Sequence, residues 1–117
     1  QVTTEMVPGV NNDVRLQNIM HMLNEGVPVV IGLRWPFPRA TQHNPTLSTQ
    51  AVIPNAAHAV TLVGYYTDSG NVDDIRFIFR NSWGMSWGVG GYGFATFGYL
   101  RTHLLEAVIV EVRTKGP

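Results

Sequence analysis

The sequence predicts an α+β protein in which one helix precedes several antiparallel strands. Apolar residues recur at the i, i+3, i+4 and i+7 positions of one helical face, at Leu16, Ile19, Met20 and Leu23. Short runs rich in β-branched and aromatic residues follow, including "HAVTLVGYY", "IRFIFRN" and "AVIVEV", and turn residues separate them. One helix followed by such strands is typical of an α+β fold with a curled sheet or partial barrel.

The first elements can be placed along the chain. With 117 residues, the chain is long enough for one compact domain, so we expect residues 1–117 to form a single domain. Residues 1–12 are expected to be an extended arm. Asn12 is the expected N-cap of a helix over residues 13–25, which Gly26 ends with a left-handed cap.

The remaining chain is expected to be mostly strand and loop. "VPVVIGL", residues 27–33, is a nearly all-apolar run and predicts a short strand buried on both faces. Residues 34–57 hold four prolines among polar residues, which predicts a long irregular loop, and loops of this length are typically functional or mobile. Residues 58–113 are expected to form antiparallel strands, with a hairpin tip at "TDSGNVDD".

Composition excludes several classes of function. Eight basic and eight acidic residues cancel, so neither nucleic acid nor an anionic membrane is an expected partner. The apolar runs are too short to span a bilayer. The chain has no cysteine, which excludes disulfides and thiolate zinc sites within it, and no motif points to a metal or cofactor. The compartment is left undetermined. Gln1 is not an initiator methionine, and we expect the chain to be a processed or excised piece of a longer protein.

His58 is the first candidate catalytic residue. It follows the long loop, opens an apolar strand that would hold it rigidly, and precedes a second polar element one hairpin later. A hairpin brings the outer ends of its two strands together, so His58 and Asn81 are expected side by side. The asparagine oxygen can then fix one imidazole tautomer. A structural histidine and a turn-capping asparagine are the simpler alternatives.

Two tryptophans favour the chemical interpretation. Trp83 and Trp87 lie in "NSWGMSWG", where small residues leave room for large indoles. An indole over a His–Asn hydrogen bond would exclude water and strengthen that bond. Core packing alone would also account for either tryptophan.

At this point the sequence resembles a known family. "HAVTLVGYY", "FIFRNSWGMSWGVGGYGFATF" and "LNEGVPVVIGL" resemble the C-terminal half of a papain-like cysteine peptidase of the C1 family. The resemblance runs from about Asp13 to the last strand. It implies the papain-like fold, here the β-barrel-like antiparallel right-hand lobe with one preceding helix, and the N-terminal helical lobe is absent from this chain.

The resemblance also implies roles for individual residues. His58 would form an ion pair with a cysteine thiolate and then protonate the leaving amine. Asn81 would orient His58, Trp83 would cover their contact, and Trp87 would border the leaving-group side of the cleft. Ala57 and Ala59 would line the pocket for the residue two before the cleavage point, and their small side chains imply that it accepts an apolar group.

The chain contains no cysteine that could act as the nucleophile. In the family, the cysteine lies near the start of a helix in the N-terminal half. No serine of this chain replaces it, because Ser82 and Ser86 belong to the motif without a base aimed at them, Ser69 lies in a turn and Ser48 lies in the loop. We therefore expect the cysteine to come from another chain or a missing upstream segment, and the isolated chain to be inactive.

Two functions of different class follow from these observations. The first is a cysteine peptidase lobe that supplies the general base and its orienting amide for the cleavage of a peptide or protein substrate, beside a complementary cysteine-bearing lobe. The alternative is a non-catalytic binding module that has lost the nucleophile. An acyl-transferring relative would use the same residues. A lobe that lacks its partner should expose an apolar face, for which Trp35, Trp87 and the "WPFP" segment are the candidates.

Overall fold

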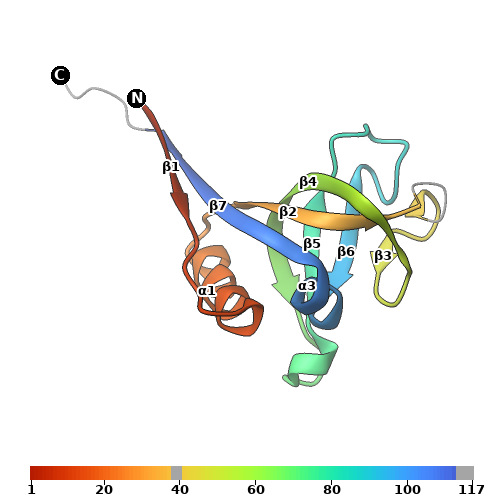
Figure 1. Ribbon diagram of the computed structural model, residues 1–117, viewed down its shortest axis with the longest axis horizontal. Coiled ribbons are helices and arrows are strands. Elements are labelled where there is room, and N and C mark those ends of the chain that lie inside the picture. The colour runs from red at the N-terminus through yellow and green to blue at the C-terminus, as the bar shows by residue number, and fades with distance from the viewer. Residues whose placement is uncertain (38–40, 113–117) are drawn as a thin grey trace.

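The computed structural model describes residues 1–37 and 41–112 (Figure 1). These residues form a seven-stranded sheet in the order β1-β7-β2-β4-β5-β6-β3. All neighbouring strands are antiparallel except β3 and β6, which are parallel. The elements are β1 (Val2–Met6), α1 (Asn12–Asn24), β2 (Val29–Pro36), β3 (Thr46–Leu47), β4 (Val52–Tyr66), η1 (Val72–Asp74), β5 (Arg76–Arg80), β6 (Tyr92–Thr96), α3 (Phe97–His103) and β7 (Leu104–Val112).

Helix α1 begins one residue earlier than the sequence suggests. Asn11, rather than Asn12, is the N-cap, and its Oδ1 accepts a hydrogen bond of 2.9 Å from the N–H of Val14. The side chain of Asn12 donates instead to the carbonyl oxygens of Arg101 and Leu104, at 3.0 and 3.1 Å. Asn12 therefore ties the start of α1 to the end of α3.

The end of α1 follows the expected glycine cap. Gly26 has a φ of +78°, in the left-handed region, and its N–H donates to the carbonyl of Leu23. The N–H of Val27 reaches the carbonyl of Met22 at 3.0 Å. This pair of bonds is a Schellman motif, which satisfies carbonyls that the helix end would otherwise leave free.

Strand β2 differs from the fully buried strand that we expected. Ile31 and Leu33 are buried, whereas Val30 and Gly32 are partly exposed and Arg34 is exposed. The alternation arises because only one face of the sheet is covered by the core. Leu33, on the covered face of β2, pairs with His58 of β4.

The long loop is shorter than predicted. Strand β2 continues to Pro36, β3 forms at Thr46–Leu47, and β4 begins at Val52. The register shifts between Arg34, which pairs with Ala57, and Pro36, which pairs with Val52. A shift of this kind accommodates prolines, which cannot donate to a regular ladder, so proline content alone overestimated the loop. Residues 38–40 of the predicted loop, and residue 113 at the end of the predicted strands, lie outside the described residues.

A second helix interrupts the strands predicted over residues 58–113. Helix α3 covers Phe97–His103, and its N-cap Thr96 accepts a hydrogen bond of 3.0 Å from the N–H of Tyr99. The Tyr99 hydroxyl donates to the carbonyl of Arg34 at 2.7 Å. Seven residues are too few to show a helical period in the sequence, and packing against β2 stabilises the helix.

The core lies on the inner face of the curled sheet. Its most buried large side chains come from α1, four strands and α3, and include Leu16, Ile19, Ile31, Leu33, Leu47, Leu62, Phe77, Phe79, Tyr99 and Leu100. In Figure 1 the strands β1 and β7 form a ribbon that leads away from the sheet body, with α1 beside it. Within the described ranges, neither helix has the length and apolar character needed to cross a bilayer.

Candidate active site

The side chains of His58 and Asn81 meet at one end of the sheet. Strands β4 and β5 pair antiparallel with Thr61 opposite Arg80, so the residue after β5 lies beside the middle of β4. Nε2 of His58 is 2.9 Å from Oδ1 of Asn81. This oxygen can only accept, so Nε2 carries the proton and Nδ1 is left as an acceptor for another group.

Asn81 is held firmly in place. Its backbone N–H donates to the carbonyl of Gly91 at 2.9 Å, and its Oδ1 also accepts from the N–H of Ser82 at 2.8 Å. The residue is only 4% exposed. Its Nδ2 atom is buried without a hydrogen-bond partner in the described part of the chain. These contacts set the amide oxygen toward His58.

Aromatic rings enclose the imidazole. The Trp83 ring lies over it with a centroid distance of 4.6 Å and an interplanar angle of 30°. The Trp35 ring meets it edge-on at 4.7 Å and 70°. Trp87 contacts the rings of Trp35 and Trp83 at 6.1 and 5.9 Å, and it also lies 5.8 Å from Phe79. The cluster restricts the ring of His58 and limits access of water to its hydrogen bond.

Trp35 is the site residue that the sequence reasoning missed. The expectation that Trp35 and Trp87 are exposed is wrong, because they are only 3% and 5% exposed. Trp35 is buried because β2 extends to Pro36 and continues the alternation of Ile31 and Leu33. That alternation was the signal that could have identified it. Phe37, in the same "WPFP" segment, is indeed exposed.

Glycines allow the Asn81–Gly91 segment to fold closely against β6. Gly88 has a φ of +60°, and a Cβ atom there would lie 2.4 Å from the carbonyl oxygen of Tyr92. At Gly93, a Cβ atom would lie 2.6 Å from Phe79 and 2.8 Å from the Trp87 ring. A side chain at Gly88 would therefore clash with the backbone of β6, and one at Gly93 would need space that the aromatic cluster occupies.

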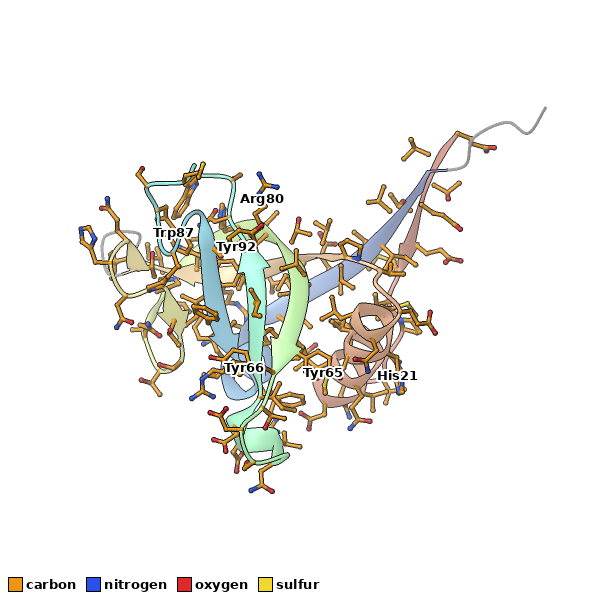
Figure 2. All side chains as sticks on the ribbon, turned by 180° about the vertical axis from the view of Figure 1, so that it is seen from behind. His21, Tyr65, Tyr66, Arg80, Trp87 and Tyr92 are labelled. Carbon is orange, nitrogen blue, oxygen red and sulfur yellow. The ribbon has the colours of Figure 1, made fainter. Side chains whose placement is uncertain are left out.

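An open cavity of about 440 Å³ adjoins Asn81 on the outer face of the sheet. Figure 2 shows Arg80, Trp87 and Tyr92 at this end of the sheet, far from His21 on α1. Ala59 lines the cavity, while the exposed Ala57 does not. The full lining is Val30, Ala59, Val60, Thr61, Arg80, Asn81, Ser82, Gly84, Met85, Gly90 and Gly91.

The other histidines have different surroundings. His21 and His43 are exposed. Burial lowers the pKa of His103, and the nearby charge of Arg34 lowers it further. Burial raises the pKa of the Tyr99 hydroxyl to about 12. In residues 1–37 and 41–112, no three His, Asp or Glu side chains gather as metal ligands would.

Comparison with known proteins identifies the family. The model of the papain family of cysteine proteases matches residues 3–102, so the chain belongs to this family. Fruit bromelain from Ananas comosus is 54% identical over 35 residues, which are 30% of this chain and 9% of that protein. A cysteine protease from Blomia tropicalis is 55% identical over 42 residues, or 36% of this chain and 12% of that protein.

Solved structures share the fold. The bromelain protease of Ananas comosus, solved with the inhibitor E64, has a TM-score of 0.64 and 20% identity, and the match covers 94% of this chain and 50% of that one. Xylellain from Xylella fastidiosa has a TM-score of 0.62 and 23% identity, with coverages of 84% and 37%. The predicted resemblance to the β-rich papain-like lobe is thus confirmed, and the chain spans half or less of these relatives.

Proposed function

We propose that this chain is the histidine-bearing lobe of a cysteine peptidase. The contact of 2.9 Å between His58 Nε2 and Asn81 Oδ1 carries the proposal, because it leaves Nδ1 as the basic nitrogen of an oriented imidazole. Membership of the papain family supports it. The cysteine would come from outside these 117 residues, since the chain contains none.

The reaction requires His58 to move one proton in each half. Nδ1 takes the proton of the cysteine thiol, and the thiolate attacks the scissile carbonyl carbon. When the C–N bond breaks, the imidazolium returns this proton to the leaving amine. His58 then takes a proton from water, which attacks the thioester and releases the acid and the thiol.

Asn81 and the tryptophans act through His58. The amide oxygen holds Nε2–H, so the ring keeps one tautomer while Nδ1 gains and loses its proton. Trp83 covers this hydrogen bond from the solvent side, since it is 41% exposed and lies against the imidazole. We assign Trp87 to the leaving-group side of the cleft and Ala57 and Ala59 to the wall that faces the acyl part of the substrate.

The cysteine-bearing lobe would dock on the outer face of the sheet. Ala59 and Thr61 lie on that face, and the cavity beside them is open to solvent. Met85 lines the same cavity and is 82% exposed, which is unusual for an apolar side chain of this size. A partner surface there would cover Met85.

The test is an assay of the assembled enzyme with a matched pair of variants. Peptide cleavage should be abolished by iodoacetamide and reduced at least about 10²-fold by His58→Ala, the size of a general acid–base contribution. His21→Ala, which replaces an exposed histidine on α1, is the control and should keep full activity. Cleavage that survives alkylation or His58→Ala would contradict the proposal.

The alternative function is a non-catalytic module that binds peptides. The open cavity and the absence of cysteine favour it. A partner lobe that carries no cysteine opposite His58 would support this function. Under it, His58→Ala would leave peptide affinity unchanged, and no thiol-dependent cleavage would occur with any partner.

A further inference from the structure

Strand β5 carries an arginine that has no counter-charge in the chain. Phe77 is buried in the core, so its neighbour Arg76 lies on the opposite, outer face of the sheet. Nη1 of Arg76 is buried, and within the described residues it has no hydrogen-bond partner. All eight acidic side chains of the sequence belong to the described part of the chain, and none of them forms an ion pair with Arg76.

Two aromatic rings lean over this part of β5. Tyr66 of β4 is opposite Arg76, on one side of the strand. Phe94 of β6 is opposite Ile78, on the other side. Strands that flank a third strand lie about 10 Å apart, yet the centroids of these two rings are 6.2 Å apart, with an interplanar angle of 87°. Both side chains therefore lean inward over β5, and only part of Arg76 stays accessible.

The surroundings of Arg76 have the composition of a protein interface. Tyr66 is 43% exposed, and Ile78 and Phe94 are partly exposed. Thr96 of β6, which is opposite Arg76 on the other side, is also partly exposed. Aromatic and arginine side chains are enriched where proteins bind one another. Partial burial removes water from one side of the guanidinium, and this strengthens its attraction to a carboxylate.

This surface is distinct from the cavity at the candidate active site. Arg80 lines that cavity, whereas Tyr66, Arg76 and Phe94 are not among its lining residues. Arg80 follows Arg76 by four residues of strand, or about 13 Å. In Figure 2, Tyr66 lies at the opposite end of the strands from Arg80 and Tyr92. The surface is thus outside the part assigned to the cysteine-bearing lobe.

We propose that Tyr66, Arg76 and Phe94 form a docking surface for a protein segment that carries an aspartate or glutamate. The carboxylate of that segment accepts hydrogen bonds from the Arg76 guanidinium, and apolar residues beside it cover the two rings. Charge complementarity selects an acidic segment, because the described chain supplies no acid to this arginine. The inference goes beyond the peptidase function, since none of these residues belongs to the candidate active site.

The first experiment titrates the ¹⁵N-labelled 117-residue chain with two acetylated and amidated peptides. Both have the sequence Ser-Leu-X-Leu-Ser, where X is glutamate or glutamine. The glutamate peptide should shift the amide signals of Tyr66, Arg76 and Phe94. It should also bind at least about fivefold more tightly than the glutamine peptide, which is the upper end for an exposed ion pair. Arg76→Gln should remove this difference, and Arg80→Gln, on the same strand and face, is the control that should retain it.

Three results would overturn the proposal. The first is the absence of shifts from the glutamate peptide, and the second is a difference between the peptides that survives Arg76→Gln. The third comes from sodium sulfate at matched ionic strength. If sulfate produces the same shifts as the glutamate peptide, the surface is a general anion site, and a protein partner is rejected.

A second experiment separates binding from folding. Because the structure gives Arg76 no partner to lose, Arg76→Met, which keeps an apolar stem against the rings, should leave the midpoint of urea unfolding unchanged or higher. A folded Arg76→Met chain that no longer distinguishes the two peptides supports the proposal. A marked decrease of the midpoint would show that Arg76 stabilises the fold, which contradicts a role in docking.

Discussion

The imidazole of His58 is fixed by a single amide oxygen. Asn81 Oδ1 accepts from His58 Nε2 at 2.9 Å and from the N–H of Ser82 at 2.8 Å, so the oxygen is saturated with donors. A neutral histidine therefore gains most by keeping its proton on Nε2. The tautomer is a consequence of this chain alone and does not require the cysteine.

This tautomer gives the first prediction. In the wild-type chain, long-range ¹H–¹⁵N correlation spectra should show His58 as the Nε2–H form at pH values where the ring is neutral. Asn81→Ala should produce a mixture of both tautomers, because the acceptor is lost. A dominant Nδ1–H form in the wild-type chain would contradict the assigned role of Asn81.

His103 gives a second prediction. Its pKa is lowered in the folded chain by burial and then by the charge of Arg34, so the unfolded chain binds a proton more readily. The free energy of unfolding should therefore be largest above the unfolded pKa of about 6.5 and fall as pH decreases below it. Urea unfolding of the wild-type chain and His103→Gln between pH 7.5 and about 5 should show a smaller decrease for the variant.

The control for His103 is another histidine. His21→Gln replaces an exposed side chain on α1 and is the comparison for the removal of one histidine. Identical pH profiles for the wild-type chain and His103→Gln would show that His103 does not contribute.

The sequence predicted the pair but not its whole environment. His58 and Asn81 were identifiable because each was expected at a strand end with a hairpin joining the strands, although β4 begins at Val52 and His58 lies near its middle. Trp35 was missed because the prolines after it suggested a loop, whereas a register shift lets β2 continue.

At the scale of elements, the glycine-rich segment is held by its contact with β6. Gly93 lies against Phe79, Trp87 and the carbonyl of Pro45, with no space for a methyl group. Gly93→Ala should lower the free energy of unfolding by about 1–3 kcal/mol through overpacking. It should also move Trp87, which tryptophan fluorescence of the native chain would detect.

A second glycine provides the matched control. Gly98 lies in helix α3, and a Cβ atom there would have no neighbour within 4 Å. Gly98→Ala should raise the free energy of unfolding by about 0.4–1 kcal/mol, because alanine has less conformational freedom to lose. A larger loss of stability from Gly98→Ala than from Gly93→Ala would contradict this packing.

The elements differ in how well local sequence determines them. Helix α1 has a clear apolar stripe and a glycine cap, so its range, Asn12–Asn24, lies close to the expected 13–25. Helix α3 has seven residues and depends on Tyr99, whose hydroxyl bonds to the backbone of β2. Short elements that tertiary contacts stabilise leave little periodic signal in the sequence.

At the scale of the molecule, several large apolar side chains remain exposed. Met85 and Phe37 are 82% and 63% exposed, and Val63 and Val89 are also exposed. A chain with these residues free should bind a hydrophobic dye in the native state. Met85→Gln together with Phe37→Gln should reduce dye fluorescence while the unfolding transition stays cooperative. If the native chain binds no dye, the proposal that a partner covers these exposed apolar side chains would be contradicted.

The most direct test of the central claim is native mass spectrometry of material purified from its natural source, before and after iodoacetamide. We expect a second polypeptide segment to accompany this chain and to gain one alkyl group, with loss of peptide cleavage in parallel. This result would show that His58 and Asn81 serve a cysteine from outside the 117 residues. A chain that occurs alone, with neither alkylation nor cleavage, would contradict the account and indicate a binding module.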